Sequence, residues 1–331
     1  MFLLKLMFAE LLLQALSTHS SLFATCTPTT SVTRCSTRLY IAEQGLPPLT
    51  CGRILTLSTD GTSPQTVLDN LCTAPDGIVV DQEAGYIYYS QMGSGVFLSG
   101  NGTIERTNLV GSERTVLIGG EMTTTPKQLI LAEVDGVKKL YWGDREGMKV
   151  MRSNINGSGV EVVIDTSTSA GSAESKLVVG VAIDTINGWF YWTQKGSSVI
   201  RNGSLHRARL IPPPGSTPSS RTDAQILLSG LPEPIDLHLR PSTNTLYWTD
   251  RGNLGQGSVN SLALGTGQTV TATPTVLVSR VGEAIGITID EATETLFFSN
   301  LGGEVYAYDL VQRTNRRIAR GLGLLTGVDL A

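Results

Sequence analysis

The sequence predicts an all-β protein, a single six-bladed β-propeller made of four-stranded antiparallel blades. Three observations lead to this prediction. An aromatic strand recurs about every fifty residues, a short apolar strand led by Gly precedes several of its copies, and no segment has the apolar period of an amphipathic helix. The chain of 331 residues contains 36 glycines and only 16% charged residues, which suits short strands joined by tight turns.

The aromatic strand has six copies along the chain. Large apolar and aromatic groups occupy successive positions in it, as expected for a strand that is buried on both faces. The copies are LYIAE (39–43), IYYSQ (87–91), LYWGD (140–144), FYWTQ (190–194), LYWTD (246–250) and LFFSN (296–300). A spacing this regular predicts one blade for each copy.

The other strands of a blade are recognised by their position around the aromatic strand. GIVVD (77–81), GVAID (180–184) and GITID (286–290) precede it, and their continuous Val and Ile predict burial on both faces. A strand that alternates apolar and polar residues follows, as in 149–155, and turns such as Asn156-Gly157 lead to a half-exposed fourth strand. Burial that falls from the first strand to the fourth is typical of a propeller blade.

The two ends of the propeller segment, residues 38–331, are expected to share one blade. The first aromatic copy, at Leu39, has no inner strand before it, and a lone strand (325–330) lies at the end of the sequence. One blade would then take its inner strand from the C-terminal segment and its outer strands from residues 38–70, which leaves no inner edge unpaired.

The N-terminal segment resembles a secretory signal peptide. Residues 1–17 are rich in Leu, Phe and Met, Lys5 lies near the start, and Ala15 and Ser17 occupy the small-residue positions before a cleavage site. A cysteine-containing segment, 18–37, follows. No other segment is long and apolar enough to cross a bilayer, so we expect a secreted chain without a membrane span.

The cysteine count supports an extracellular location. An even number of cysteines in a secreted protein predicts two disulfides, here from Cys26, Cys35, Cys51 and Cys72. Three pairings are open, and we favour Cys26 with Cys35 and Cys51 with Cys72 because both close short loops. A zinc site is the alternative, but the paired CxxC spacing and a nearby His are missing.

Surface features of the sequence point to a glycoprotein rather than a nucleic-acid-binding protein. Sequons at Asn101, Asn156 and Asn202 predict N-glycosylation. The net charge of -4 argues against binding to nucleic acid. The only basic run is interpreted as a solvated outer strand, with an anion site as the alternative; it comprises Arg313, Arg316, Arg317 and Arg320. A Pro/Ser-rich insertion, 211–223, predicts an exposed loop that either tolerates deletion or takes part in recognition.

The repeats resemble the YWTD repeats of the low-density lipoprotein receptor class B family, a family of six-bladed propellers. The resemblance covers residues 38–331 and rests on the Gly-led inner strands and on Tyr141, Trp142, Tyr191, Trp192, Tyr247, Trp248 and Asp250. Asp144 also keeps the terminal acid, whereas Glu43, Gln91, Gln194 and Asn300 replace it. The resemblance implies that these aromatic and acidic residues are structural, and that an unaccompanied propeller like this one, without cysteine-dense or EGF-like modules, departs from the receptors.

An active centre, if present, is expected at the axis where the inner strands begin. The polar residues there are Asp76, Gln128, Asp236, Glu283 and Thr326. Calcium-dependent lactonases and esterases among six-bladed propellers place oxygen ligands at such positions, and calcium takes 6 to 8 of them; hydrated groups lining a pore are the alternative. His238 is either an axial base or a packed core residue. The sequence contains neither a GxSxG elbow nor a phosphate-binding loop.

The leading hypothesis is therefore a secreted, glycosylated, non-catalytic propeller that binds an extracellular protein or glycan without a cofactor. The alternative is a calcium-dependent propeller hydrolase or lactonase that uses Asp76, Gln128, Asp236 and Glu283. A purely structural component of an extracellular matrix or cell wall is a third interpretation. The absence of a catalytic constellation favours the first hypothesis.

Overall fold

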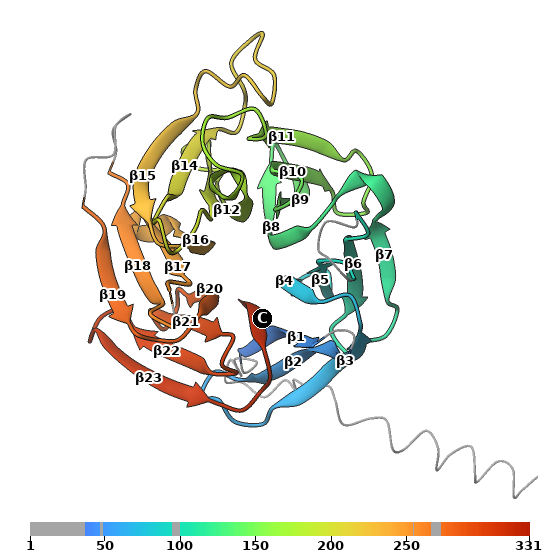
Figure 1. The fold of residues 1–331 in the computed structure, drawn as a ribbon. Helices are drawn as coiled ribbons and strands as arrows, with labels where there is room; N and C mark the ends of the chain where they lie inside the picture. Colours follow the sequence, from blue (N-terminus) through green and yellow to red (C-terminus); the bar gives the residue numbers. More distant parts are fainter. Residues whose placement is uncertain (1–36, 47–48, 95–99, 254, 266–272) are drawn as a thin grey trace, which may run out of the picture. The chain divides into compact units, whose positions relative to one another are not determined.

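The structure is a computed structural model that describes residues 37–331 apart from 47–48, 95–99, 254 and 266–272. Residues Arg38–Ala331 form one compact unit. In its described residues, six four-stranded antiparallel sheets are arranged around a central axis (Figure 1), which confirms the predicted six-bladed propeller. The predicted signal peptide, Cys26 and Cys35 lie outside the described residues.

Each blade is named here by its place along the chain, with its strands given from the axis outward. Blade 1 comprises β4 (Pro75–Asp81), β5 (Tyr86–Gln91), β6 (Thr103–Asn108) and β7 (Thr115–Ile118). Blade 2 comprises β8 (Pro126–Val134), β9 (Val137–Asp144), β10 (Lys149–Asn154) and β11 (Glu161–Asp165). Blade 3 comprises β12 (Val178–Asp184), β13 (Trp189–Gln194), β14 (Gly203–Arg209) and β15 (Gln225–Leu231).

The remaining blades follow the same order. Blade 4 comprises β16 (Pro234–Arg240), β17 (Thr245–Asp250), β18 (Ser258–Ala263) and β19 (Thr275–Ser279). Blade 5 comprises β20 (Ala284–Asp290), β21 (Thr295–Asn300), β22 (Val305–Asp309) and β23 (Thr314–Ala319). Short 3-10 turns lie at η1 (Gly120–Met122), η2 (Glu174–Lys176) and η3 (Pro241–Thr243). In the described part of the chain, none of the helices is long and apolar enough to span a membrane.

Blade 6 contains strands from both ends of the compact unit. Its order is β24 (Leu325–Leu330), β1 (Arg38–Leu46), β2 (Thr50–Ser58) and β3 (Gln65–Leu71). Leu39 pairs with Leu330 and Ile41 pairs with Val328. A disulfide joins Cys51 to Cys72 at the end of β3, which confirms this predicted pair.

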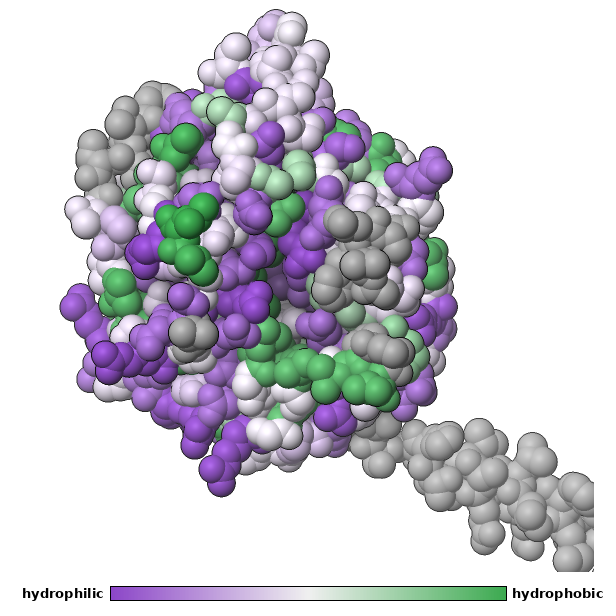
Figure 2. Space-filling model, in the orientation of Figure 1, coloured by the Kyte–Doolittle hydropathy of each residue, from purple (hydrophilic) through white to green (hydrophobic). Residues whose placement is uncertain are grey.

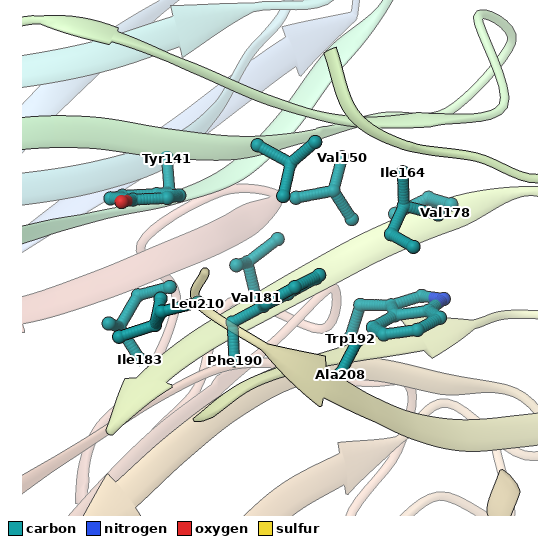
Figure 3. Packing of buried hydrophobic residues seen from close by; sticks show 11 residues of the cluster. Tyr141, Val150, Ile164, Val178, Val181, Ile183, Phe190, Trp192, Ala208 and Leu210 are labelled. Carbon is teal, nitrogen blue, oxygen red and sulfur yellow. The ribbon is translucent and has the colours of Figure 1, made fainter. Parts of the chain in front are cut away.

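The aromatic strands are the second strands of the blades, and their side chains fill the space between neighbouring blades. In Figure 3, Tyr141 and Val150 of blade 2 face Phe190 and Trp192 of blade 3 across one such contact. Trp142, Trp192 and Trp248 are fully buried. A buried aromatic side chain removes about 150 to 250 Å² from water, so these residues form the hydrophobic core.

The fourth residue of the aromatic strand links adjacent blades, a role that the sequence analysis did not assign. The Thr193 hydroxyl accepts a hydrogen bond from Gly180 N at 2.8 Å and donates one to Ile235 O of blade 4 at 2.8 Å. Equivalent bridges are made by Ser90, Thr249 and Ser299. In blade 2 the position is Gly143, where an added Cβ would lie 2.3 Å from Val179 O.

The surface agrees with some of the sequence expectations. Arg316 and Arg317 lie on β23, the outermost strand of blade 5, as the outer-strand interpretation requires. The side chains of Asn101 and Asn156 are exposed, and that of Asn202 is partly buried. Their glycosylation stays a prediction.

Candidate functional site

A cavity of about 280 Å³ lies on the axis, at the face where the inner strands begin, which we call the mouth face. Two rings of equivalent residues line it. The inner ring consists of the second residues of the inner strands, Asp76, Lys127, Val179, Ile235, Ile285 and Thr326. The outer ring consists of the residues that follow the aromatic strands, Gln44, Met92, Arg145, Lys195, Arg251 and Leu301. In Figure 2, hydrophilic residues surround the hollow at the centre of the propeller.

The two rings give the cavity two chemically different sides. Blades 2, 3 and 4 place Arg145, Lys195 and Arg251 in the outer ring. Blades 3, 4 and 5 place an apolar arc in the inner ring, made of Val179, Ile235 and Ile285. Cationic donors therefore lie next to an aliphatic wall over consecutive blades.

Acidic residues hold these cations from outside the cavity lining. Lys195 forms an ion pair with Glu233. Arg251 reaches Glu233 at 3.4 Å and Glu283 at 3.2 Å. Its Nε atom is buried and has no hydrogen-bond partner in the described part of the chain. A group that enters the cavity would meet cationic donors first, and one of these donors is unsatisfied.

A buried ion pair lies across the cavity from the apolar arc, in blades 1 and 2. Lys127 Nζ lies 2.8 Å from Asp76 Oδ1, and Gln128 Nε2 donates to Asp76 Oδ2 at 3.2 Å. The ammonium group also lies 2.9 Å from the sulfur of Met92. Burial lowers the pKa of Lys127 to about 8, although the carboxylate of Asp76 opposes this shift.

Two further carboxylates connect the inner strands beyond the cavity. Asp236 accepts hydrogen bonds from Leu237 N at 2.9 Å and from Ile287 N of blade 5 at 3.1 Å. Asp329 accepts one from Val80 N of blade 1 at 2.8 Å. Burial raises the pKa of Asp236 to about 8 and that of Asp329 to about 6.

The structure brings together only some of the predicted axial residues. Asp76 and Gln128 are in contact, Asp236 binds backbone groups at the third position of its strand, and Glu283 pairs with Arg251 at the rim. Thr326 donates its hydroxyl hydrogen to either Ala42 O or Pro75 O, each at 3.2 Å.

These residues do not fit a calcium site. Across residues 37–331 outside the gaps, no group of three or more His, Cys, Asp or Glu side chains is arranged to hold a metal ion. The Lys127 ammonium occupies the position beside Asp76 that a cation would need. Calcium dependence stays a prediction, which melting curves with and without a chelator would test.

His238 lies on β16, where it pairs with Tyr247, and it is partly buried. Burial lowers its pKa to about 4, which leaves the ring neutral at physiological pH. Of the two interpretations of His238, this environment favours the packed core residue.

The residues at the ends of the aromatic strands support the mouth face. Asp144 accepts hydrogen bonds from Thr124 N at 2.9 Å and Thr125 N at 2.6 Å. Asp250 accepts them from Glu233 N at 2.9 Å and Gly252 N at 3.1 Å. Burial raises the pKa of Asp250 to about 6. Each carboxylate thus holds the segment that leads into its own inner strand, in keeping with the structural role expected of it.

The sequence analysis did not predict the three cations of the outer ring. Arg145, Lys195 and Arg251 each follow directly after an aromatic strand, and this shared position is a signal that the repeat alignment already contained.

Comparison with known proteins gives a consistent picture. No family model matches the chain. It is 40% identical over 313 residues to low-density lipoprotein receptor-related protein 1 of Pyricularia oryzae, covering 90% of this chain and 99% of the relative. It is 35% identical over 296 residues to the 3-hydroxyacyl-CoA dehydrogenase-like protein LAM1 of Cochliobolus heterostrophus, covering 84% of this chain but only 61% of that relative. Among solved structures, a chain of a nidogen/laminin complex superposes with a TM-score of 0.67 at 18% identity, over 89% of this chain and 98% of that one, which shows a shared fold.

Proposed function

The chain belongs to the YWTD-repeat family of six-bladed β-propellers, the low-density lipoprotein receptor class B family, and from this premise we propose that it is a non-catalytic extracellular binding module. Its ligand is a protein segment that places a carboxylate next to an aliphatic side chain at the axial cavity of the mouth face. The observation that carries this proposal is that the three cations of the outer ring lie beside the apolar arc.

The polar half of this recognition rests on Arg145, Lys195 and Arg251. Hydrogen bonds from charged donors to a carboxylate are roughly twice as strong as neutral ones, and Arg can bind a carboxylate through two donors. The unpartnered Nε of Arg251 would gain a hydrogen bond if a ligand oxygen approached it. The neighbouring Val179 and Ile235 offer a dry surface to the aliphatic part of the ligand.

Exposed apolar side chains on the mouth face support a protein partner. Leu46 is the last residue of β1 and Leu49 lies in the connection between β1 and β2, whereas Val199 and Ile200 lie in the connection between β13 and β14. Both connections leave the blade at the end where the cavity opens. Figure 2 shows hydrophobic residues beside the central hollow. Exposed apolar surface with a polar surround is typical of protein-binding surfaces.

An extracellular location is part of the proposal. The Cys51–Cys72 disulfide supports it, because disulfides persist mainly in oxidising compartments. The predicted signal peptide of residues 1–17 and the three sequons agree with the same location.

Selection from a random peptide library displayed on phage tests the ligand class. We expect the selected peptides to share an Asp or Glu next to an aliphatic residue. Their binding should fall sharply in a Lys195→Gln/Arg251→Gln variant, because the two changes remove cations that line the cavity. A matched Arg313→Gln/Arg316→Gln variant removes the same charge near or on β23, on the outer edge of blade 5, and should bind as the unaltered protein does.

Two outcomes would overturn the proposed ligand class. One is a set of selected peptides without an acidic residue. The other is equal binding by the Lys195→Gln/Arg251→Gln variant and the unaltered protein, which would place the binding surface away from the axial cavity.

A further inference from the structure

A second depression, the side groove, lies away from the axis between blades 2 and 3 and has a volume of about 330 Å³. One wall is the segment that follows β11, and the other is the end of the Pro/Ser-rich insertion. The residues used in the argument are Ser169, Trp192, Gln194, His206, Ser219 and Gln225, all of which line the groove. None of them lines the axial cavity.

The insertion is anchored across the blade boundary. Pro218 O accepts a hydrogen bond from Asp165 N at the end of β11, at 2.9 Å. Arg221 donates to Asp223 from Nε at 2.8 Å and from Nη2 at 2.7 Å, and Nη2 also donates to Arg209 O at 2.6 Å. In Figure 1 the insertion lies at the outer rim, between the labels of β14 of blade 3 and β11 of blade 2. The wall of the groove is therefore formed before any ligand binds.

Gln194 occupies the terminal position of the aromatic strand, but it does not bind the backbone before its inner strand as Asp250 does. Asp250 binds the backbone N–H of Glu233, the residue just before its inner strand. In blade 3 the equivalent N–H, that of Leu177, donates instead to Glu174 O at 3.3 Å within the turn η2. Within the described residues, the Gln194 side chain makes one long hydrogen bond, from Ser204 Oγ at 3.4 Å. Its amide is thus available to the groove.

An aromatic pair forms the floor. The rings of Trp192 and His206 stack with centroids 5.0 Å apart, and His206 Nε2 lies 2.7 Å from Ser204 Oγ. Trp192 Nε1 is buried and has no hydrogen-bond partner in the described part of the chain. Figure 3 shows this nitrogen at the end of the cluster farthest from Tyr141. Trp248 Nε1 also has no partner among the described residues, so a missing partner does not by itself indicate a site. Trp192 differs from Trp248 because it lines the groove.

The groups that line the groove are mostly uncharged. Two amides, from Gln194 and Gln225, and two hydroxyls, from Ser169 and Ser219, can each donate and accept hydrogen bonds. Burial lowers the pKa of His206 to about 4, so its ring is neutral. Two charged residues line the groove. Arg221 is paired with Asp223, and Asp165 Oδ1 accepts hydrogen bonds from the backbone N–H and the hydroxyl of Ser167.

From this combination we propose that the side groove binds a neutral hexose unit of a saccharide. A sugar ring presents hydroxyl groups that both donate and accept, together with C–H surfaces that pack on apolar and aromatic groups. The volume falls within the usual range for small-ligand sites, about 300 to 1,000 Å³. The residues of this site do not line the axial cavity, so the proposal does not depend on the proposed peptide site.

Saturation-transfer NMR with the methyl glycosides of glucose, mannose, galactose and N-acetylglucosamine tests the proposal. At least one glycoside should receive saturation from the unaltered protein. Binding should weaken by about tenfold or more in Gln194→Ala, which removes the amide, and in Ser219→Tyr, which fills the groove from an exposed position. Pro214→Tyr is the control, because Pro214 is an exposed residue of the same insertion that lines neither this groove nor the axial cavity.

Melting curves of the same variants separate a binding role from a structural one. Gln194→Ala should melt as the unaltered protein does, since its side chain makes only one long hydrogen bond. The proposal is wrong if no glycoside receives saturation, if Gln194→Ala and Ser219→Tyr bind as tightly as Pro214→Tyr, or if Gln194→Ala loses binding only together with its fold. Peptide binding at the mouth face should be unchanged in all three variants.

Discussion

The Nζ atom of Lys127 lies 2.8 Å from Oδ1 of Asp76, and this buried ion pair joins the inner strands of blades 1 and 2 at the bottom of the axial cavity. Only 10% of the lysine side chain and 3% of the aspartate side chain are exposed. Each charge of this buried pair is therefore compensated by the other, and the loss of one partner would leave an uncompensated buried charge.

Removal of one partner should destabilise the propeller more than removal of both. Lys127→Met leaves the Asp76 carboxylate buried with only the Gln128 amide, at a cost of about 3 to 5 kcal/mol in the free energy of unfolding. The double variant Lys127→Met/Asp76→Asn removes both charges and should recover most of that loss. Urea denaturation of the two single variants and the double variant measures the coupling. Additive effects would mean that the pair contributes no coupling.

The bridging hydroxyls between blades give a second prediction. Thr193→Val removes an acceptor for Gly180 N and a donor to Ile235 O, and both backbone groups are buried. We expect a loss of about 2 to 6 kcal/mol, because two buried groups are left unsatisfied and each costs about 1 to 3 kcal/mol. Thr193→Ser keeps the hydroxyl and should lose much less. Equal midpoints for the two variants in urea denaturation would show that the hydroxyl does not link the blades.

A third prediction separates the structural motif from the binding surface. Asp250→Ala leaves the N–H groups of Glu233 and Gly252 without their acceptor, so the melting temperature should fall, by the equivalent of about 1 to 3 kcal/mol for each group. Binding of a selected acidic peptide should persist, since Asp250 does not line the cavity. Calorimetric melting and a peptide titration on the same sample measure both effects. An equally stable variant that no longer binds would contradict the structural role.

The number and order of the blades could be predicted because the aromatic strand meets the same surroundings in every blade. Tyr141, Tyr191 and Tyr247 each lie between two blades, and such burial on both faces demands large apolar groups at successive positions. The repeat in the sequence therefore reflects a repeat in packing. Turns such as Asn156-Gly157 could be predicted as the ends of strands because Asn and Gly favour turn conformations.

The candidate site was harder to predict because it depends on register and on distant contacts. Inner strands shift register after their first residue, as between Pro75 and Ile78 and between Pro234 and Leu237. Asp76, the second residue of its strand, lines the cavity, whereas Asp236, the third residue of its strand, binds the backbone of blade 5. The contact of the insertion with β11 could not be predicted from the sequence either, because no local sequence pattern connects Pro218 to Asp165.

The Cys51–Cys72 disulfide should contribute to stability. The two residues are 21 positions apart, and closing a loop of this size stabilises a fold by about 3 kcal/mol through the unfolded state. Urea midpoints with and without reductant should therefore differ, and Cys51→Ser/Cys72→Ser should not respond to reductant in this way. Peptide mapping without reduction would also test the predicted Cys26–Cys35 pair. Identical midpoints would show that the bond adds nothing to stability.

The buried carboxyl of Asp236 predicts how stability depends on pH. Burial raises its pKa in the folded protein to about 8, whereas an unfolded Asp titrates near 3.9. Between about pH 4 and pH 8 the folded state thus binds one more proton at this site than the unfolded state. The contribution of Asp236 to stability therefore falls as pH rises through that window and levels off above it.

Asp236→Asn cannot ionise and should lose this part of the pH dependence, whatever the substitution does to the hydrogen bonds from Leu237 N and Ile287 N. Melting temperatures of both proteins measured across the window provide the test. We expect the difference between the variant and the unaltered protein to shift in favour of the variant as pH rises. Parallel curves would show that Asp236 is already ionised in the folded propeller at low pH.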